Sequence, residues 1–242
     1  MVSPYLSLGV AVHDVLEPLA WIPAAERLAV DFRREFLKNY STFSGKKGGF
    51  TTQDEEEDFK QRGLDMLANV WSNPGPLLNP SLRLSKSRDD LPWIWLSEKD
   101  EIILCGKADW LEYKNGGSRV IDFKTGNREE KDDSLQLPIY QILIKNLMKT
   151  PLIGAAYWYI AKNAELTEKS LPNFEKSLNK VTEVAYRIKE ARSAKAFDCP
   201  YGGCRNCEPY QRLIDGEGEF LGFGGFGQEL YYLKDYKVSN DK

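Results

Sequence analysis

The chain has little of what marks membrane, secreted or strongly basic nucleic-acid-binding proteins. It contains no run of about eighteen apolar residues, so the sequence predicts no membrane span. Its N-terminus has no basic segment followed by an apolar run, which predicts no secretory signal peptide. The 33 basic and 36 acidic residues give a net charge of −3. This balance excludes a global basic field, so any contact with nucleic acid depends on a local patch or a bound metal.

Histidine and cysteine are scarce, with one histidine and four cysteines. Four cysteines in a chain without a signal peptide indicate metal ligands or buried thiols rather than disulfides, and we expect a cytoplasmic protein. Hydrophobic residues at 42% and charged residues at 29% are typical of globular proteins. A chain of 242 residues can bury one substantial core, so we predict a single domain over residues 1–242.

The hydrophobic spacing changes along the chain. Residues 1–75 have a helical pattern, with a second helical segment from Pro23 and an acidic helix capped by Thr52. Residues 80–161 are strand-like in "SLRLS", "PWIWLS", "EIILCGKADWLEY", "SRVIDFKTG" and "GAAYWYI", with a helix in "SLQLPIYQILIKNLMKT" before the last of these. A polar helix and a cysteine segment occupy residues 172–214, and the tail at 215–242 is expected to add an edge strand. This order predicts an α/β fold with a central mixed sheet flanked by helices.

An acid precedes a lysine by two residues at several places. Asp58 and Lys60 lie in a charged helical run, where they point about 200° apart and form a solvated face. The triplet at residues 235–237 lies near a terminus and is expected to be exposed. The triplet in "VIDFKTG" differs because it ends an apolar strand, which places Asp122 and Lys124 on one face about 7 Å apart.

A predicted hairpin brings a second acid to this strand. The dipeptide Asn115-Gly116 is a strong signal for a two-residue turn. With that turn Asp109 lies opposite Asp122, with Cβ atoms about 5 Å apart. The same register pairs Glu112 with Arg119 and Trp110 with Ile121. A turn at residues 116–117 would shift the pairing by two and still leave both aspartates on one face.

Two opposed carboxylates repel one another unless a cation lies between them. Hard oxygen ligands of this kind suit Mg²⁺ or Mn²⁺. The register also sets Lys107 opposite Lys124, so two lysines and two aspartates could instead alternate as a surface quartet without a metal. Geometry alone leaves both interpretations open.

These motifs resemble those of the PD-(D/E)XK nuclease superfamily, and most closely those of RecB-type exonucleases and CRISPR-associated spacer-processing nucleases. Four elements occur in the family's order over about residues 9–140, and the resemblance implies a restriction-endonuclease-like core. They are "GVAVHDVLE" with His13, "GKAD" with Asp109, "VIDFKTG" with Asp122 and Lys124, and "QLPIY", similar to the Q-x-x-x-Y element, with Gln136 and Tyr140.

The resemblance implies a role for each residue. His13, Asp109, Asp122 and the backbone carbonyl of Phe123 would hold one or two Mg²⁺ or Mn²⁺ ions, which polarise the scissile phosphate and lower the pKa of a bound water. Lys124 would orient or help deprotonate that water and stabilise charge on the phosphate. Gln136 and Tyr140, on one helix face, would position Lys124 and the nucleic-acid strand. Without the family pattern, a lone histidine on an apolar helix indicates a core residue, and this glutamine and tyrosine indicate packing at a helix edge.

The function implied by the resemblance is a metal-dependent deoxyribonuclease. It would act as an exonuclease or end-trimming enzyme on DNA in repair, recombination or defence, with a helicase or integrase-type protein as candidate partner. A catalytically idle nuclease-like binding or scaffold module is the alternative, although such a module has no physical reason to keep opposed carboxylates. An unrelated α/β protein with a surface charge quartet is the third interpretation.

The segment "CPYGGCRNC" places Cys199, Cys204 and Cys207 close enough to suggest thiolate ligation of a metal. The resemblance implies a 4Fe-4S cluster held by one cysteine before the histidine helix and three near the C-terminus. Here no cysteine precedes His13, and Leu213 stands where a later one would fall. A cluster, zinc and no metal therefore stay open, and so does the question whether the chain is a fragment or truncated gene product. Cys105 is the other candidate ligand, with a buried thiol as the favoured interpretation.

Overall fold

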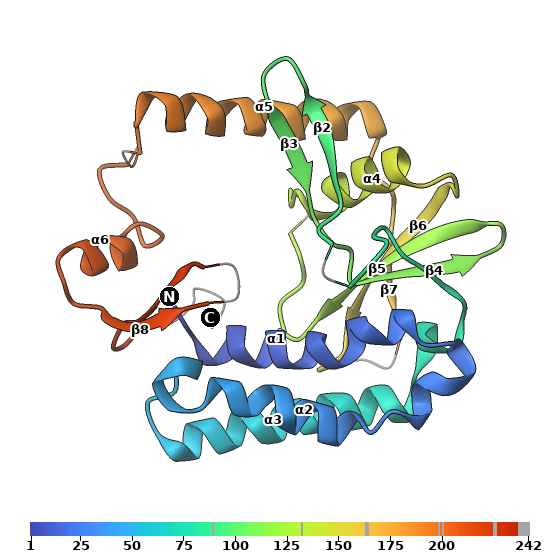
Figure 1. Cartoon of the computed structure of the whole chain (residues 1–242), viewed down its shortest axis with the longest axis horizontal. Coiled ribbons are helices and arrows are strands. Elements are labelled where there is room, and N and C mark those ends of the chain that lie inside the picture. Colours follow the sequence, from blue (N-terminus) through green and yellow to red (C-terminus); the bar gives the residue numbers. More distant parts are fainter. Residues whose placement is uncertain are drawn as a thin grey trace. The chain divides into compact units, whose positions relative to one another are not determined.

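The computed structural model describes residues 1–88, 90–131, 133–162, 165–197, 199, 201–224 and 227–236 (Figure 1). The chain divides into two compact units. The first comprises residues 1–15, 31–71 and 198–242, and the second comprises residues 16–30 and 72–197. The single domain over residues 1–242 stays a prediction. Within the described ranges, no helix is both long and apolar enough to cross a lipid bilayer.

A five-stranded mixed sheet forms the centre of the second unit, in the order β1-β4-β5-β6-β7. Only β5 and β6 run parallel, and every other neighbouring pair is antiparallel. The strands are β1 (Ser81–Leu82), β4 (Trp110–Lys114), β5 (Gly117–Lys124), β6 (Leu152–Tyr159) and β7 (Thr167–Lys169). The predicted α/β class with a central mixed sheet is confirmed.

The hairpin between β4 and β5 has the predicted register. Trp110 pairs with Ile121 and Glu112 with Arg119. The connecting residues Asn115 and Gly116 have φ angles of 51° and 77°, as a type I′ turn requires. This tight turn fixes which side chains of the two strands face one another.

Helix α4 (Gln136–Leu147) connects the parallel strands β5 and β6 and packs on one face of the sheet (Figure 1). Pro138 lies in its first turn, where a missing amide costs nothing. Helix α5 (Phe174–Ala194) packs against α4 as a further helical layer and begins at Asn173, whose side chain accepts a hydrogen bond from the Lys176 amide. The core between α4 and the sheet includes Leu111, Val120, Tyr140, Ile144 and Ala155.

Strands β2 (Trp93–Ser97) and β3 (Ile102–Cys105) form a separate antiparallel hairpin rather than part of the central sheet. The single strand predicted for "EIILCGKADWLEY" is therefore two strands in different sheets, interrupted at residues 106–109. The expectation of a buried thiol is also wrong, because Cys105 lies on the exposed face of this hairpin. Opposite it on β2, Trp93 is also exposed.

Buried Arg27 joins residues 16–30 to the rest of the second unit. Its guanidinium donates hydrogen bonds to the carbonyls of Leu19, Ile22, Leu77 and Asn79 and to the Ser81 hydroxyl, at 2.7 to 3.0 Å. It also lies 4.8 Å from the centroid of the Trp110 ring. Short 3-10 helices surround it, namely η1 (Glu17–Trp21), η2 (Ala24–Ala29) and η5 (Gly75–Leu78).

The first unit is mainly helical, with α1 (Pro4–Leu16), α2 (Phe32–Tyr40), α3 (Gln53–Ser72), α6 (Glu208–Ile214), η3 (Ser41–Phe43) and η4 (Gly45–Gly48). Thr52 caps α3 as predicted, since its hydroxyl accepts a hydrogen bond from the Glu55 amide at 3.1 Å. The helical segment expected from Pro23 is broken, because Asp31 starts a new helix by accepting from the Arg34 amide.

The tail forms an antiparallel hairpin of β8 (Glu219–Phe223) and β9 (Glu229–Tyr232) where one edge strand was expected. The Tyr231 carbonyl accepts a hydrogen bond from the Val2 amide, and Glu219 pairs with Lys46 at 2.6 Å. These contacts fix the hairpin to the N-terminal end of the same unit.

Replacing Arg119 by alanine should destabilise the second unit strongly. Its guanidinium pairs at 2.6 Å with Glu112, whose side chain is fully buried. Removing it leaves an unpaired buried carboxylate, and we expect a loss of about 3–5 kcal/mol in unfolding free energy, measured by urea denaturation. The control is Glu168→Ala, which removes the exposed partner of the same arginine and should cost at most about 1 kcal/mol. Equal losses in the two variants would contradict this account.

Replacing Gly63 by alanine should destabilise the first unit, although alanine is the better helix former. A Cβ atom at this position of α3 would lie 2.2 Å from Cζ of Phe36. Overpacking of this kind costs about 1–3 kcal/mol, which exceeds the gain of about 1 kcal/mol in helix propensity. We expect a lower thermal midpoint for Gly63→Ala, partly restored when Phe36→Leu is added. A higher midpoint for the single variant would show that the helices do not pack this closely.

Candidate active site

Asp122 lies near the end of β5 and is almost fully buried, at 2% exposure. Its Oδ1 accepts a hydrogen bond from the Tyr140 hydroxyl at 2.8 Å and a second from the Gln136 amide. Its Oδ2 lies 2.8 Å from Nζ of Lys124. A buried carboxylate is stable only when it is paired and hydrogen-bonded, and these three partners supply both.

Asp109 directly precedes β4 and lies next to the Asp122 strand. Its Oδ2 accepts a hydrogen bond from the backbone amide of Phe123 at 2.7 Å. Burial raises the pKa of the Tyr140 hydroxyl, and the charges of Asp109 and Asp122 raise it further. Both carboxylates therefore act on the same buried hydroxyl, as expected if the hairpin brings them together.

Lys124, the last residue of β5, has two acidic partners. Its Nζ lies 2.8 Å from Oδ2 of Asp122 and 2.9 Å from Oε2 of Glu130. Burial by itself would lower the pKa of Lys124, but Asp122 and Glu130 more than offset this and raise the pKa above its ordinary value. The lysine is therefore a charged hydrogen-bond donor at neutral pH.

Glu130, the second acidic partner of Lys124, was not predicted from the sequence. Burial would raise the pKa of Glu130, but hydrogen bonds from Lys124 and Ser134 and the charge of Lys124 lower it overall. Its backbone amide donates to the Tyr159 hydroxyl at 2.9 Å. The signal available in the sequence was the acidic run "REEKDD" after the "VIDFKTG" motif, but periodicity could not show which acid turns back to the lysine.

Helix α4 contributes Gln136 and Tyr140, which lie one turn apart. Gln136 connects the two charged groups of β5: its carbonyl oxygen accepts from Nζ of Lys124 at 2.7 Å, and its amide nitrogen donates to Asp122. The same nitrogen lies 3.2 Å from the Tyr140 hydroxyl. The structure therefore joins Asp122, Lys124, Gln136 and Tyr140 in one hydrogen-bonded network.

The donor set of the second unit fits a divalent cation that prefers oxygen. Asp122 supplies carboxylate oxygens from β5 and Asp109 from the residue before the adjacent strand β4, and the Phe123 carbonyl belongs to the same segment of β5. The chemistry suits Mg²⁺ or Mn²⁺, which bind through carboxylates and carbonyls, rather than zinc. These ligand assignments stay predictions.

The quartet interpretation expected Lys107 to lie opposite Lys124 and to pair with the aspartates. The structure shows a different contact for Lys107. Its Nζ is exposed and donates a hydrogen bond to the backbone carbonyl of Arg88 at 2.8 Å. The helical lysine Lys60 forms an ion pair with Glu57 on α3, which agrees with a solvated face. In the third triplet, Lys237 lies outside the described residues.

His13 lies on α1 in the first unit and is half-buried. Asp109, Asp122 and Lys124 belong to the second unit. The role of His13 as a metal ligand stays a prediction that rests on the family motif.

Three cysteines come together in the first unit. The Sγ atoms of Cys199, Cys204 and Cys207 lie within 4.8 Å of one another, so they could hold one metal ion. Hydrogen bonds from the backbone amides of Cys207 and Asn206 lower the pKa of the Cys204 thiol, whereas the hydrogen bond with Cys204 raises the pKa of Cys207 to about 11. Without a metal, the site therefore favours one thiolate, at Cys204. Three thiolates are one ligand short of the four that zinc and iron–sulfur sites use. Cys105 lies in the second unit.

Known proteins resemble the chain over most of its length. Residues 2–212 match the model of the PD-(D/E)XK nuclease superfamily. The Gene 69 protein of Mycobacterium phage D29 is 24% identical over 218 residues, which cover 81% of this chain and 79% of the phage protein. No solved structure matches with comparable significance. The family match spans both the hairpin and α4, as the sequence motifs predicted, and the chain therefore belongs to the PD-(D/E)XK nuclease superfamily.

Proposed function

We propose that this protein is a metal-dependent deoxyribonuclease that degrades or trims DNA from strand ends. The observation that carries the proposal is the buried network of Asp122, Lys124 and Gln136, with Asp109 beside it just before the neighbouring strand β4. Such a network costs desolvation energy, and an idle binding module gains nothing from it. Action on ends, as in RecB-type exonucleases, is supported by the set of four motifs that includes Gln136 and Tyr140.

Nucleases of this superfamily typically use Mg²⁺ or Mn²⁺. Asp109, Asp122 and the Phe123 carbonyl would hold the ion, with His13 as a further ligand from the family motif. When bound, the ion supplies Lewis-acid chemistry by polarising the phosphate and lowering the pKa of water.

Lys124 would act as a fixed donor toward the reacting phosphate. Its ammonium is held from two sides, by the Gln136 carbonyl and by Asp122 and Glu130. A donor that is already oriented stabilises developing negative charge without the cost of reorganisation during the reaction. Gln136 positions this group and does not itself need to contact the substrate.

Tyr140 would orient Asp122. Its hydroxyl donates to Oδ1 of that carboxylate at 2.8 Å, and burial raises its pKa, so the hydroxyl is protonated at neutral pH. This leaves the second carboxylate oxygen directed toward Lys124.

The cysteine segment of the other unit would have a structural role, with or without a metal.

Replacing Lys124 by alanine should abolish most of the cleavage of end-labelled DNA in Mg²⁺ or Mn²⁺. Loss of one oriented donor to a developing anion lowers rates by about 10²- to 10³-fold. The increase in thermal midpoint on adding the metal should persist, because Asp109 and Asp122 are intact, and should disappear in Asp122→Asn.

Lys107→Ala is the matched control for this experiment. Its side chain is exposed and its Nζ bonds only to a carbonyl among the described residues, so cleavage should stay at the wild-type rate. If both lysine variants lost activity equally, the role assigned to Lys124 would be wrong. If wild-type protein cleaved neither single- nor double-stranded DNA with either metal, the chain would act as a nuclease-like binding module instead.

Tyr140→Phe should lower the cleavage rate about tenfold, the effect of losing one hydrogen bond of roughly 1.4 kcal/mol. Because the hydroxyl orients Asp122 and does not contact the strand, we expect kcat to fall while KM for DNA stays unchanged. The thermal midpoint should also fall, because a hydrogen bond to a buried carboxylate contributes about 1.5–3 kcal/mol to stability. Tyr113→Phe, at an exposed tyrosine of β4, is the control and should change none of the three. A fall in stability without a specific fall in kcat would assign Tyr140 a packing role alone.

A further inference from the structure

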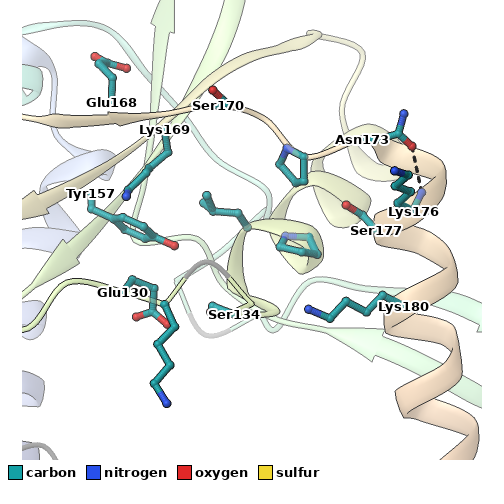
Figure 2. A pocket seen from close by; sticks show the side chains of 14 residues that line it. Glu130, Ser134, Tyr157, Glu168, Lys169, Ser170, Asn173, Lys176, Ser177 and Lys180 are labelled. Atoms are coloured by element: carbon teal, nitrogen blue, oxygen red, sulfur yellow. Dashed lines mark hydrogen bonds between the residues drawn. The ribbon is translucent and has the colours of Figure 1, made fainter.

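A pocket of about 520 Å³ lies in the second unit, beside the network around Lys124. Its walls come from the segment before α4, the first turn of α4, β6, β7 and the beginning of α5 (Figure 2). This volume is within the range of pockets that bind small molecules or single residues of a polymer. Leu137 and Pro138 of the "QLPIY" motif line this pocket, but no residue to which the family motifs assign a role does.

Positive charge predominates in this pocket. Four lysines line it, namely Lys131, Lys169, Lys176 and Lys180. Two glutamates also line it, but each is already paired: Glu130 with Lys124, and Glu168 with Arg119. Within the described parts of the chain, none of the four lysines forms an ion pair with a carboxylate. The pocket therefore has an excess of cationic charge available to an anion.

The other groups of the pocket suit an anion with several acceptor oxygens. Serine hydroxyls at positions 170 and 177 line it, whereas the Ser134 hydroxyl, also in the lining, already donates to Glu130. The first turn of α5 contributes Asn173, Lys176 and Ser177, so the positive end of the helix dipole also faces the pocket. Figure 2 shows Lys180 extending from α5 toward Ser134, and its Nζ donates to the Asp133 carbonyl at 2.7 Å.

The pocket shares a wall with the candidate active site. Glu130 lines the pocket and lies 2.9 Å from Nζ of Lys124. Tyr157, also in the lining, has Lys124 Nζ at 5.0 Å and Lys169 Nζ at 5.8 Å from its ring centroid. Figure 2 shows Lys169 and Glu130 close to the Tyr157 side chain. A ligand in the pocket would therefore lie beside any strand positioned at Lys124.

We propose that this pocket binds a phosphate group of the DNA strand other than the phosphate being cleaved, through Lys169, Lys176 and Lys180. The proposal rests on the proposed nuclease function, because that function supplies a polyanionic strand at Lys124. The phosphate could be the terminal phosphate of the strand or an internal one of its backbone. Occupation of the pocket would fix the position of the strand relative to the cleavage site.

The test measures binding apart from cleavage. Asp122→Asn protein is titrated with a fluorescent single-stranded oligonucleotide at several salt concentrations, with and without the additional change Lys176→Glu or Lys169→Ala. We expect affinity to fall at least tenfold for Lys176→Glu, and the slope of log K against log salt to become shallower by about 0.7 for each phosphate that the variant no longer binds. Lys114→Glu is the matched control, an exposed lysine at the β4–β5 turn, outside the pocket.

The source of the phosphate follows from the same titration. Oligonucleotides with a phosphate or a hydroxyl at the 5′ end, and likewise at the 3′ end, are compared. An effect of Lys176→Glu confined to one phosphorylated end shows that the pocket takes the terminal phosphate. An equal effect on all of them shows that it takes an internal phosphate.

Failure of this proposal differs from failure of the nuclease proposal. If wild-type protein cleaves DNA but both pocket variants bind as Lys114→Glu does, with unchanged salt slope, the pocket does not hold phosphate and the nuclease stands. If binding depends on the pocket while wild-type protein cleaves nothing, the phosphate site stands and the nuclease does not.

Absence of measurable binding by Asp122→Asn protein at low salt overturns the proposal that the pocket binds phosphate. The thermal midpoint of Lys176→Glu should equal that of its parent, because Lys176 is exposed.

Discussion

The antiparallel pairing of β4 and β5 is the constraint on which the candidate site depends. The turn at Asn115 and Gly116 sets the register, and the register determines that Asp122 lies on the face covered by α4, next to Asp109. A slip by one residue would turn Asp122 and Lys124 to the opposite face of the sheet. Gln136 and Tyr140 would then have no carboxylate or ammonium to bind.

The two faces of this hairpin hold buried charge in different ways. On one face, buried Glu112 pairs with Arg119, which also contacts the exposed Glu168. On the other, Asp122 is satisfied by Lys124, Gln136 and Tyr140, which come from two different elements, a strand end and a crossover helix. A buried ion pair rarely adds net stability over well-packed apolar residues. The second network is consistent with the proposed function, which uses its carboxylate and its ammonium.

The local signals in the sequence were reliable where neighbouring residues decide the structure. The turn and the Thr52 cap both follow from backbone preferences of a few residues. The strand predicted across residues 106–109 was wrong because an apolar, alternating segment gives no information about which partner each half will pair with. For the same reason the exposure of Cys105 was not predictable, since it depends on a separate two-stranded hairpin.

The sequence by itself determined the superfamily, the mixed α/β class and the hairpin register, because motif order, periodicity and turn chemistry are local properties of the chain. Only the tertiary structure decided that Glu130 turns back to Lys124, that Gln136 bridges Lys124 and Asp122, and that four lysines from three segments line one pocket. Those contacts depend on the path of the loop after β5 and on the packing of α4 and α5. Contacts of this kind join residues that are distant in the chain. They therefore produce no hydrophobic periodicity or local motif from which the sequence could predict them.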